Sequence, residues 1–351
     1  MQGFFRFTLS SLFLTLCFAA LTGAATLIGR GLPAQLLTFE ARIEGIANVY
    51  LYDSGRGTTV NLTHDSLYAV GASWSPDGQR MLFVSPRSGR MAFYLYDLAA
   101  HRISYLLTPQ IMGGGGQSDS EWSPDGRWLA VNLQSDPPYL YILNMTTSPV
   151  EMSRLNVLNT ANDMTWAPDS TRVSISGYFN NGTQIVAYDV REGRFINLTW
   201  AQAAFTLDRN AVWSPDGTQI AFVRDQNGTQ LVIMPADGTG DPLLPAVPVS
   251  TSVRPVWSPD SRWLLASVEG GLARVDAQTG DFTLLAADGE LHAHQLFTPD
   301  GSAFIDTRYS ASAGWRLYWT HVDGSESRLL PVTAANALIP QWGPQWPPEG
   351  R

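Results

Sequence analysis

The sequence predicts an all-β protein, a seven-bladed β-propeller, on three observations. A short motif, Trp-Ser-Pro-Asp-Gly in its full form, recurs at intervals of 40 to 48 residues. Between successive copies lie short apolar segments that turn-forming residues separate. Many of these segments are apolar on both faces, so the sheets that they form must be covered on both sides. Four-stranded antiparallel units that repeat at this period and stack radially meet that requirement.

The chain opens with an apolar segment that precedes the repeats. Residues 7–29 carry no charge and lie between two arginines. A helix of this length rises roughly 34 Å, enough for a hydrocarbon core of about 30 Å. We therefore predict a signal anchor over residues 1–30, with signal-peptide cleavage near residues 23–25 as the alternative. By similarity to signal anchors we place residues 31–351 outside the cytoplasm, periplasmic or at the cell surface, although the flanking charges alone do not fix the orientation.

The units are counted from the aromatic residue that opens each copy of the motif. Residues 36–63 match the last three strands of a unit, and "ALIPQWGP" at 337–344 matches only a first strand. Joining these ends in one composite blade closes the ring and removes an open sheet edge. A six-bladed ring, with residues 36–63 packed elsewhere, is the alternative. The aromatic positions are Trp74, Trp122, Trp166, Trp213, Trp257, Phe297 and Trp342.

The repeated motif is interpreted as a hairpin turn and not as a nucleophile site. Proline presets φ for a turn, the Ser and Asp oxygens can accept backbone hydrogen bonds, and glycine tolerates a positive φ. Ser170 and Ser261 replace this glycine, so we expect either mild strain or another turn type there. The aromatic residue of each copy is expected to be buried between neighbouring blades.

The units resemble the PD40, or TolB-like, repeat. The resemblance rests on "WSPDG" at 74–78, 122–126 and 213–217, on "IAFVR" at 220–224 and on "YLYD" at 94–97. It covers residues 36–344 and implies the propeller fold, while it says little about function.

Function is expected where the repeats differ from one another. Three residues before each aromatic residue, near the start of the innermost strand, the chain varies between polar, charged and small side chains. We predict that the polar ones approach one mouth of the central channel and bind a ligand or partner. These candidates are Asp119, Asp163, Asn210, Arg254 and His294, while Gly71 and Ile339 occupy the other two positions.

His292 and His294 form a His-x-His pair whose side chains share a face if the strand is regular. Two imidazoles supply half of a typical zinc site, and Asp119 or Asp163 could converge on it across the channel. The architecture also resembles that of oligogalacturonate lyases, which implies a histidine-containing metal site. A metal-assisted polysaccharide lyase is therefore an alternative function.

Composition excludes several other chemistries. The formal charge of −9 and the pI near 5.0 leave no basic surface for nucleic acid. All basic residues besides histidine are arginine, so lysine chemistry is absent. The single cysteine, Cys17, lies in the apolar segment, so residues 31–351 can form neither a disulfide nor a cysteine metal site. Neither a Gly-x-Ser-x-Gly elbow nor a phosphate-binding glycine loop occurs, and we expect no cofactor.

Together these observations predict a membrane-anchored, extracytoplasmic propeller that binds a protein or peptide at the channel mouth and adjacent loops, and they favour this binding role over an enzymatic one. The alternatives are the metal-assisted lyase and a purely structural spacer. The sequence names neither the partner nor the oligomeric state.

Overall fold

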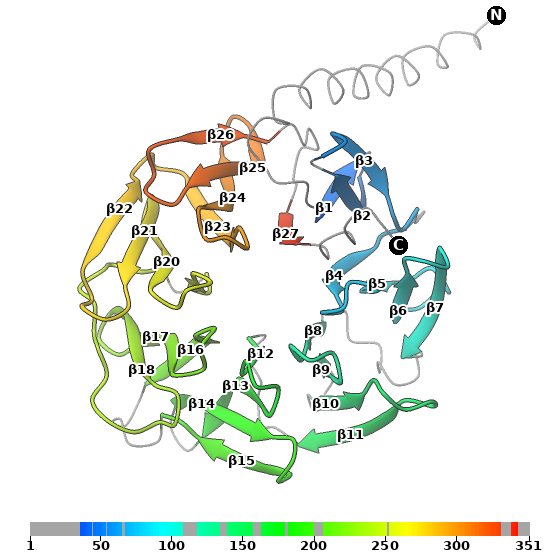
Figure 1. Cartoon of the computed structure of the whole chain (residues 1–351), viewed down its shortest axis with the longest axis horizontal. Helices are drawn as coiled ribbons and strands as arrows, with labels where there is room; N and C mark the ends of the chain where they lie inside the picture. The colour runs from blue at the N-terminus through cyan, green and yellow to red at the C-terminus, as the bar shows by residue number, and fades with distance from the viewer. Residues whose placement is uncertain are drawn as a thin grey trace, which may run out of the picture.

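The computed structural model describes residues 36–330 and 338–342, with gaps at 44, 54, 65–66, 108–117, 134–138, 157–162, 180–181, 200–205 and 251–252. Its described elements are all β-strands, which confirms the predicted all-β class. Their sheets follow one another around a ring, an arrangement consistent with a β-propeller (Figure 1). No helix in this part of the chain is long and apolar enough to cross a membrane. The predicted anchor, residues 1–30, lies outside the described residues.

Strands from the two ends of the chain meet in one sheet. β1 runs antiparallel to β2 on one side and to β27 on the other, with Leu37 opposite Trp342 and Thr38 opposite Gln341. This pairing confirms the predicted composite sheet, and it covers an edge of β1 that would otherwise be open. The strands in spatial order are β27 (Leu338–Trp342), β1 (Leu36–Ile43), β2 (Ile46–Asp53) and β3 (Thr58–Asn61).

The remaining strands repeat the same antiparallel unit. Four sheets have four strands in chain order: β4 (Val70–Trp74), β5 (Arg80–Ser85), β6 (Ala92–Asp97) and β7 (Arg102–Leu107); β8 (Ser118–Trp122), β9 (Trp128–Leu133), β10 (Tyr139–Asn144) and β11 (Glu151–Asn156); β19 (Val256–Trp257), β20 (Trp263–Val268), β21 (Gly271–Asp276) and β22 (Phe282–Ala286); and β23 (Leu291–Phe297), β24 (Ala303–Ser310), β25 (Gly314–His321) and β26 (Ser327–Leu329).

A further sheet contains two units that a single parallel bridge, Thr183 to Leu207, joins. The first unit has four strands, and the second has three, beside which Leu243 adds an isolated bridge to Ile233. These strands are β12 (Thr165–Trp166), β13 (Arg172–Phe179), β14 (Gly182–Asp189), β15 (Arg194–Asn197), β16 (Leu207–Trp213), β17 (Gln219–Asp225) and β18 (Thr229–Pro235).

The hydrophobic core lies between neighbouring units, because successive side chains of a strand point to opposite faces of its sheet. On β5, Met81 and Phe83 pack toward the composite sheet, in the same cluster as Val49. Leu82 and Val84 pack on the other face, in a cluster with residues of β9. All four of these β5 side chains are buried. Each unit therefore needs a neighbour on both sides, as the two-sided apolar pattern predicts.

The repeated motif forms the predicted hairpin turn between the first two strands of a unit. In the first copy the Ser75 hydroxyl donates to Asp77 and accepts the Arg80 amide N–H at 3.0 Å. The amide of Gly78 donates to the Ser75 carbonyl at 2.7 Å, and Gly78 has a φ of 65°. The serine and aspartate side chains thus hold the turn, and this is a structural role.

The motif tryptophans from Trp74 to Trp257 are buried, and all of them except Trp122 donate a hydrogen bond from the indole N–H to the preceding unit. Trp74 donates to the Thr38 hydroxyl and Trp213 donates to the Ser174 hydroxyl, both at 3.0 Å. Where the preceding unit lacks that hydroxyl, the indole of Trp166 instead donates to a backbone carbonyl at 2.9 Å. The expected burial between units is confirmed, and part of it is a directional polar contact.

The turns that lack the glycine show the expected strained backbone and an additional contact. Ser170 and Ser261 have φ values of 60° and 61°, in the left-handed region. Each hydroxyl accepts the amide N–H of the motif aspartate in the preceding unit, Asp125 or Asp216, at 3.0 Å. At these two positions the backbone of the serine is strained, and its hydroxyl forms a hydrogen bond to the preceding unit.

We expect Ser170→Ala to lower the free energy of unfolding by about 1 kcal/mol, because it loses this hydrogen bond and keeps the strain. Ser170→Gly loses the same bond but relieves the strain, so it should remain close to the wild type. Chemical denaturation of the two variants measures the difference. An alanine variant as stable as the glycine variant would contradict this account.

Candidate functional site

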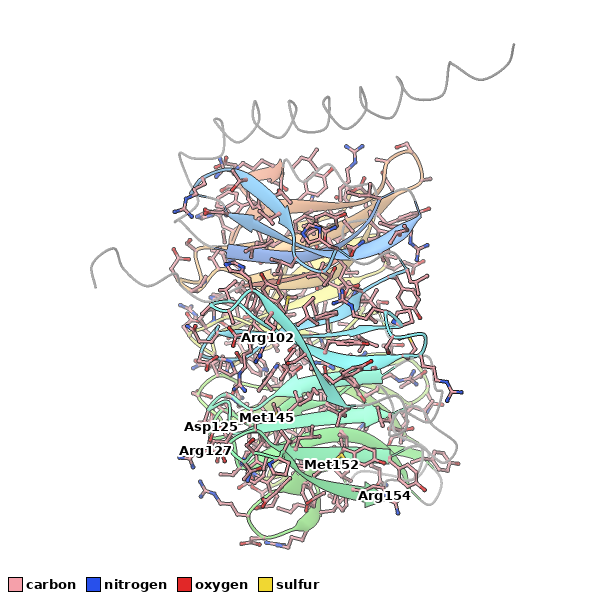
Figure 2. All side chains as sticks on the ribbon, turned by 90° about the vertical axis from the view of Figure 1, so that its right-hand side faces the viewer. Arg102, Asp125, Arg127, Met145, Met152 and Arg154 are labelled. Atoms are coloured by element: carbon pink, nitrogen blue, oxygen red, sulfur yellow. The ribbon has the colours of Figure 1, made fainter. Side chains whose placement is uncertain are left out.

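The strand connections distinguish the two faces of the ring. The turns between the first and second strands and between the third and fourth strands of each unit lie on one face, which we call the turn face; Figure 2 shows Arg102, Asp125 and Arg127 together on that side. The connections into β4, β16 and β23 lie on the opposite face, which we call the mouth face, because each of these strands runs from there to its turn. The positions three residues before each motif aromatic therefore lie toward the mouth face.

Three of those positions are β-bulges. Gly71, Asn210 and His294 have φ values of 67°, 59° and 51°, and the ladder shifts register at each of them. A bulge bends the strand and re-aims its side chains, and a positive φ is uncommon for a residue other than glycine. The innermost strands are therefore kinked at the places where the sequence departs from the repeat.

A buried carboxylate of the preceding unit receives the bulge at Gly71. The Glu40 Oε1 atom accepts the amide N–H groups of Gly71 and Ala72, at 2.5 and 3.3 Å. Burial raises the pKa of Glu40, and the two amide donors act in the opposite direction. Sequence analysis did not single out this glutamate, because it lies in a strand of otherwise apolar spacing.

Asp163 plays the same part for the bulge at Asn210. Its Oδ2 atom accepts hydrogen bonds from the Ser176 hydroxyl and from the Asn210 amide. Its Oδ1 atom is buried and accepts no hydrogen bond within the described chain. Burial raises the pKa of Asp163, while those donors and the positive charge of Arg254 act to lower it.

Arg254 precedes the motif tryptophan of the unit that stands between those of Asn210 and His294. Its guanidinium influences both Asp163 and His294, so three predicted residues from three different units lie near one another. Partial loss of water around the imidazole of His294 lowers its pKa, and the positive charge of Arg254 lowers it further. The His294 side chain nevertheless keeps an exposed surface. We call Asp163, Asn210, Arg254 and His294 the mouth cluster. Of the other candidates, Asp119 pairs with Asn132 on β9, and its side chain lies outside the described part of the structure.

The two histidines of the His-x-His pair have separate environments, because the bulge makes the strand irregular between them. His292 is fully buried. Its Nδ1 atom lies 2.6 Å from an Asp306 carboxylate oxygen, and its Nε2 atom lies 3.1 Å from one of Asp288. Burial acts to lower the pKa of His292, but the two carboxylates outweigh it and raise the pKa. Arg308 donates to the same oxygen of Asp306 at 2.7 Å.

No group of three or more His, Cys, Asp or Glu side chains is placed to hold a metal ion within the described ranges. The carboxylates beside His292 serve its imidazole and Arg308 instead. A second buried ion pair occupies the equivalent rung of the β16 unit, where Arg224 donates to both carboxylate oxygens of Asp208, at 2.7 and 2.8 Å. Sequence analysis missed both networks, because they pair residues on adjacent strands that local spacing does not connect.

Comparison with known proteins agrees with this architecture. The sequence pattern of the PD40 family, described as the TolB beta propeller domain, matches residues 117–346. The chain belongs to this family. The PD40 assignment accounts for the repeat, the hairpin turns and the ring of antiparallel sheets.

Individual relatives cover only parts of this PD40 chain or share only its fold. A protein named as an uncharacterized peptidase, YuxL of Bacillus subtilis, is 32% identical over 117 residues, which are 31% of this chain and 17% of that protein. The Tol-Pal system protein TolB of Anaeromyxobacter dehalogenans is 34% identical over 93 residues, 26% of this chain and 20% of that protein. The structure of an oligogalacturonate lyase from Vibrio parahaemolyticus has a TM-score of 0.59 at 14% identity and covers 84% of this chain and 85% of its own. The matched segments thus span at most a fifth of these two sequence relatives, and the lyase shows the fold alone.

Asp306→Asn should lower the free energy of unfolding by about 3–5 kcal/mol, because it leaves His292 and Arg308 without their shared buried carboxylate.

The wild type should also lose stability as the pH rises. A raised pKa means that the protonated imidazole of His292 stabilises the fold fully below about pH 6.5, and that this contribution disappears as the pH passes the pKa of the folded state. Thermal denaturation between pH 5 and 9 should show this decline in the wild type and not in the variant. Asp241→Asn, at an exposed carboxylate, is the control.

Arg254→Gln should raise the pKa of His294, because the variant removes a positive charge that disfavours the protonated imidazole. Histidine NMR titration of the five imidazoles measures this pKa, and His294→Gln identifies the resonance. Arg262→Gln, at an exposed arginine on the turn face, should leave the pKa unchanged. An unchanged pKa in the Arg254 variant would mean that the two side chains do not interact.

Proposed function

We propose that the chain is a membrane-anchored, extracytoplasmic β-propeller that binds a protein or peptide through its mouth face. The ring would contain seven blades, with the sheet of β27, β1, β2 and β3 as the closing blade. Residues 1–30 would anchor it in the membrane. Two observations support the binding role: the Asn210 amide donates to Asp163 across two units, and Arg254 lies within electrostatic range of both Asp163 and His294.

The construction of the mouth cluster supports a binding role over a spacer role. Its bulges place Asn210 and His294 in the left-handed region, where side chains other than glycine are strained. The hydrogen bond from the Asn210 amide to Asp163 stabilises one of these kinks without any external partner. A structural spacer does not need a cluster of polar side chains that differs from the repeat.

The position of Leu36 supports an arrangement in which the mouth face points away from the membrane. β1 begins at Leu36 opposite Asp53, beside the turn that leads into β3. Leu36, where the described chain begins, therefore lies toward the turn face. An anchor at that point would leave the mouth face open to partners outside the membrane.

Affinity capture with the full-length protein tests the proposal. The wild type is compared with the double variant Arg254→Gln/His294→Gln and with Arg262→Gln as the turn-face control. We expect the wild type and the control to retain equal amounts of at least one partner. The double variant should retain about tenfold less of that partner, consistent with the loss of one or two charge-assisted contacts. The partner is then purified and its affinity is measured directly. Equal retention of every partner by the double variant would refute a role for the mouth.

A further inference from the structure

We propose that the mouth cluster recognises a carboxylate of a peptide, with the Arg254 guanidinium as its binding group. This inference rests on the proposed function and specifies the chemistry of the same site. The carboxylate could be a C-terminus or the side chain of an aspartate or glutamate.

The first argument is that the guanidinium of Arg254 is half-buried and forms no ion pair or hydrogen bond in the described part of the chain. Arg209 shares this property, whereas Arg224 and Arg308 of other units are paired with Asp208 and Asp306. Arginine is the side chain that recognises carboxylates with two parallel hydrogen bonds, so a half-buried guanidinium without a partner is suited to an external anion.

The second argument is that Asp163, although close enough to influence Arg254, does not use it. The Oδ2 atom of Asp163 is engaged by Ser176 and by the Asn210 amide, and burial of the carboxyl raises its pKa. Asp163 thus fixes the kink at Asn210 and does not form an ion pair with Arg254. His294 adds no competing charge, because its lowered pKa keeps the imidazole neutral at pH 7.

The third argument concerns the apolar side chains of the mouth face. Exposed large apolar side chains lie at strand ends and in a connection on this face in several units, and four of the seven are aliphatic. Aliphatic and tyrosine surfaces both suit the apolar side chains of a peptide. These side chains are Ile43, Leu67, Tyr68, Tyr178, Leu207, Leu291 and Tyr309.

Three pools of synthetic hexapeptides test the inference on the full-length protein in detergent micelles. One pool contains aspartate and glutamate and has blocked ends, the second has only neutral residues and a free C-terminus, and the third has neutral residues and blocked ends. We expect the first or the second pool to bind, which distinguishes the two sources of the carboxylate, and we expect the third pool not to bind. Arg254→Gln should weaken that binding by about tenfold to a hundredfold, the range for a lost hydrogen bond to a charged group. Arg254→Lys should fall between, because it keeps the charge and loses the paired geometry, and Arg262→Gln should have no effect.

Several results would overturn the inference. Equal binding of all three pools that Arg254→Gln does not weaken would reject carboxylate recognition. If His294→Gln abolished this equal binding, the proposed function of the mouth face would still stand. Binding of a trigalacturonate that depends on Arg254, with no binding of any peptide pool, would reject the peptide assignment. No binding of any pool would reject the inference as well, and the capture experiment would then decide the proposed function independently.

Discussion

The need of each sheet to be covered on both faces is the constraint on which the structure depends. A strand such as β5 sends Met81 and Phe83 to one neighbour and Leu82 and Val84 to the other, so no unit can bury its core alone. Radial stacking satisfies this constraint for every unit, provided that neither end of the series is left open. The pairing of β27 with β1 removes that open end, and it ties the stability of the first strands to residues near the C-terminus.

Polar contacts between units are added to this apolar stacking, and they also build the mouth. On the turn face, Ser170 and Ser261 bind the amides of the preceding unit, and deeper in the ring the indoles of Trp74 and Trp213 bind its hydroxyls. Toward the mouth face, Glu40 and Asp163 accept the amides of the next bulge. The same type of contact thus serves stability on one face and positions the candidate binding residues on the other.

The electrostatics of the interior divide the charged residues into two groups. His292, Asp306 and Arg308 satisfy one another within a single unit, as do Asp208 and Arg224, and these sets account for stability. Arg254 differs because its interactions with Asp163 and His294 act at a distance and leave its hydrogen-bond donors unused in the described chain. Burial without a partner costs free energy, and a ligand with a complementary charge would recover it.

The sequence alone determined the repeat, the hairpin turns, the two-sided burial and the joining of the end strands, because turn chemistry and apolar spacing are local properties of the chain. The sequence also identified the position at which the units differ from one another, which Asp163, Asn210, Arg254 and His294 occupy. Only the tertiary structure decided which of these side chains meet, that Glu40 supports a bulge, and that His292 belongs to a buried ion network while His294 does not. The physical reason is that bulges and pairs between units depend on the packing of strands that are distant in sequence, and a single-residue shift in register re-aims every side chain beyond it.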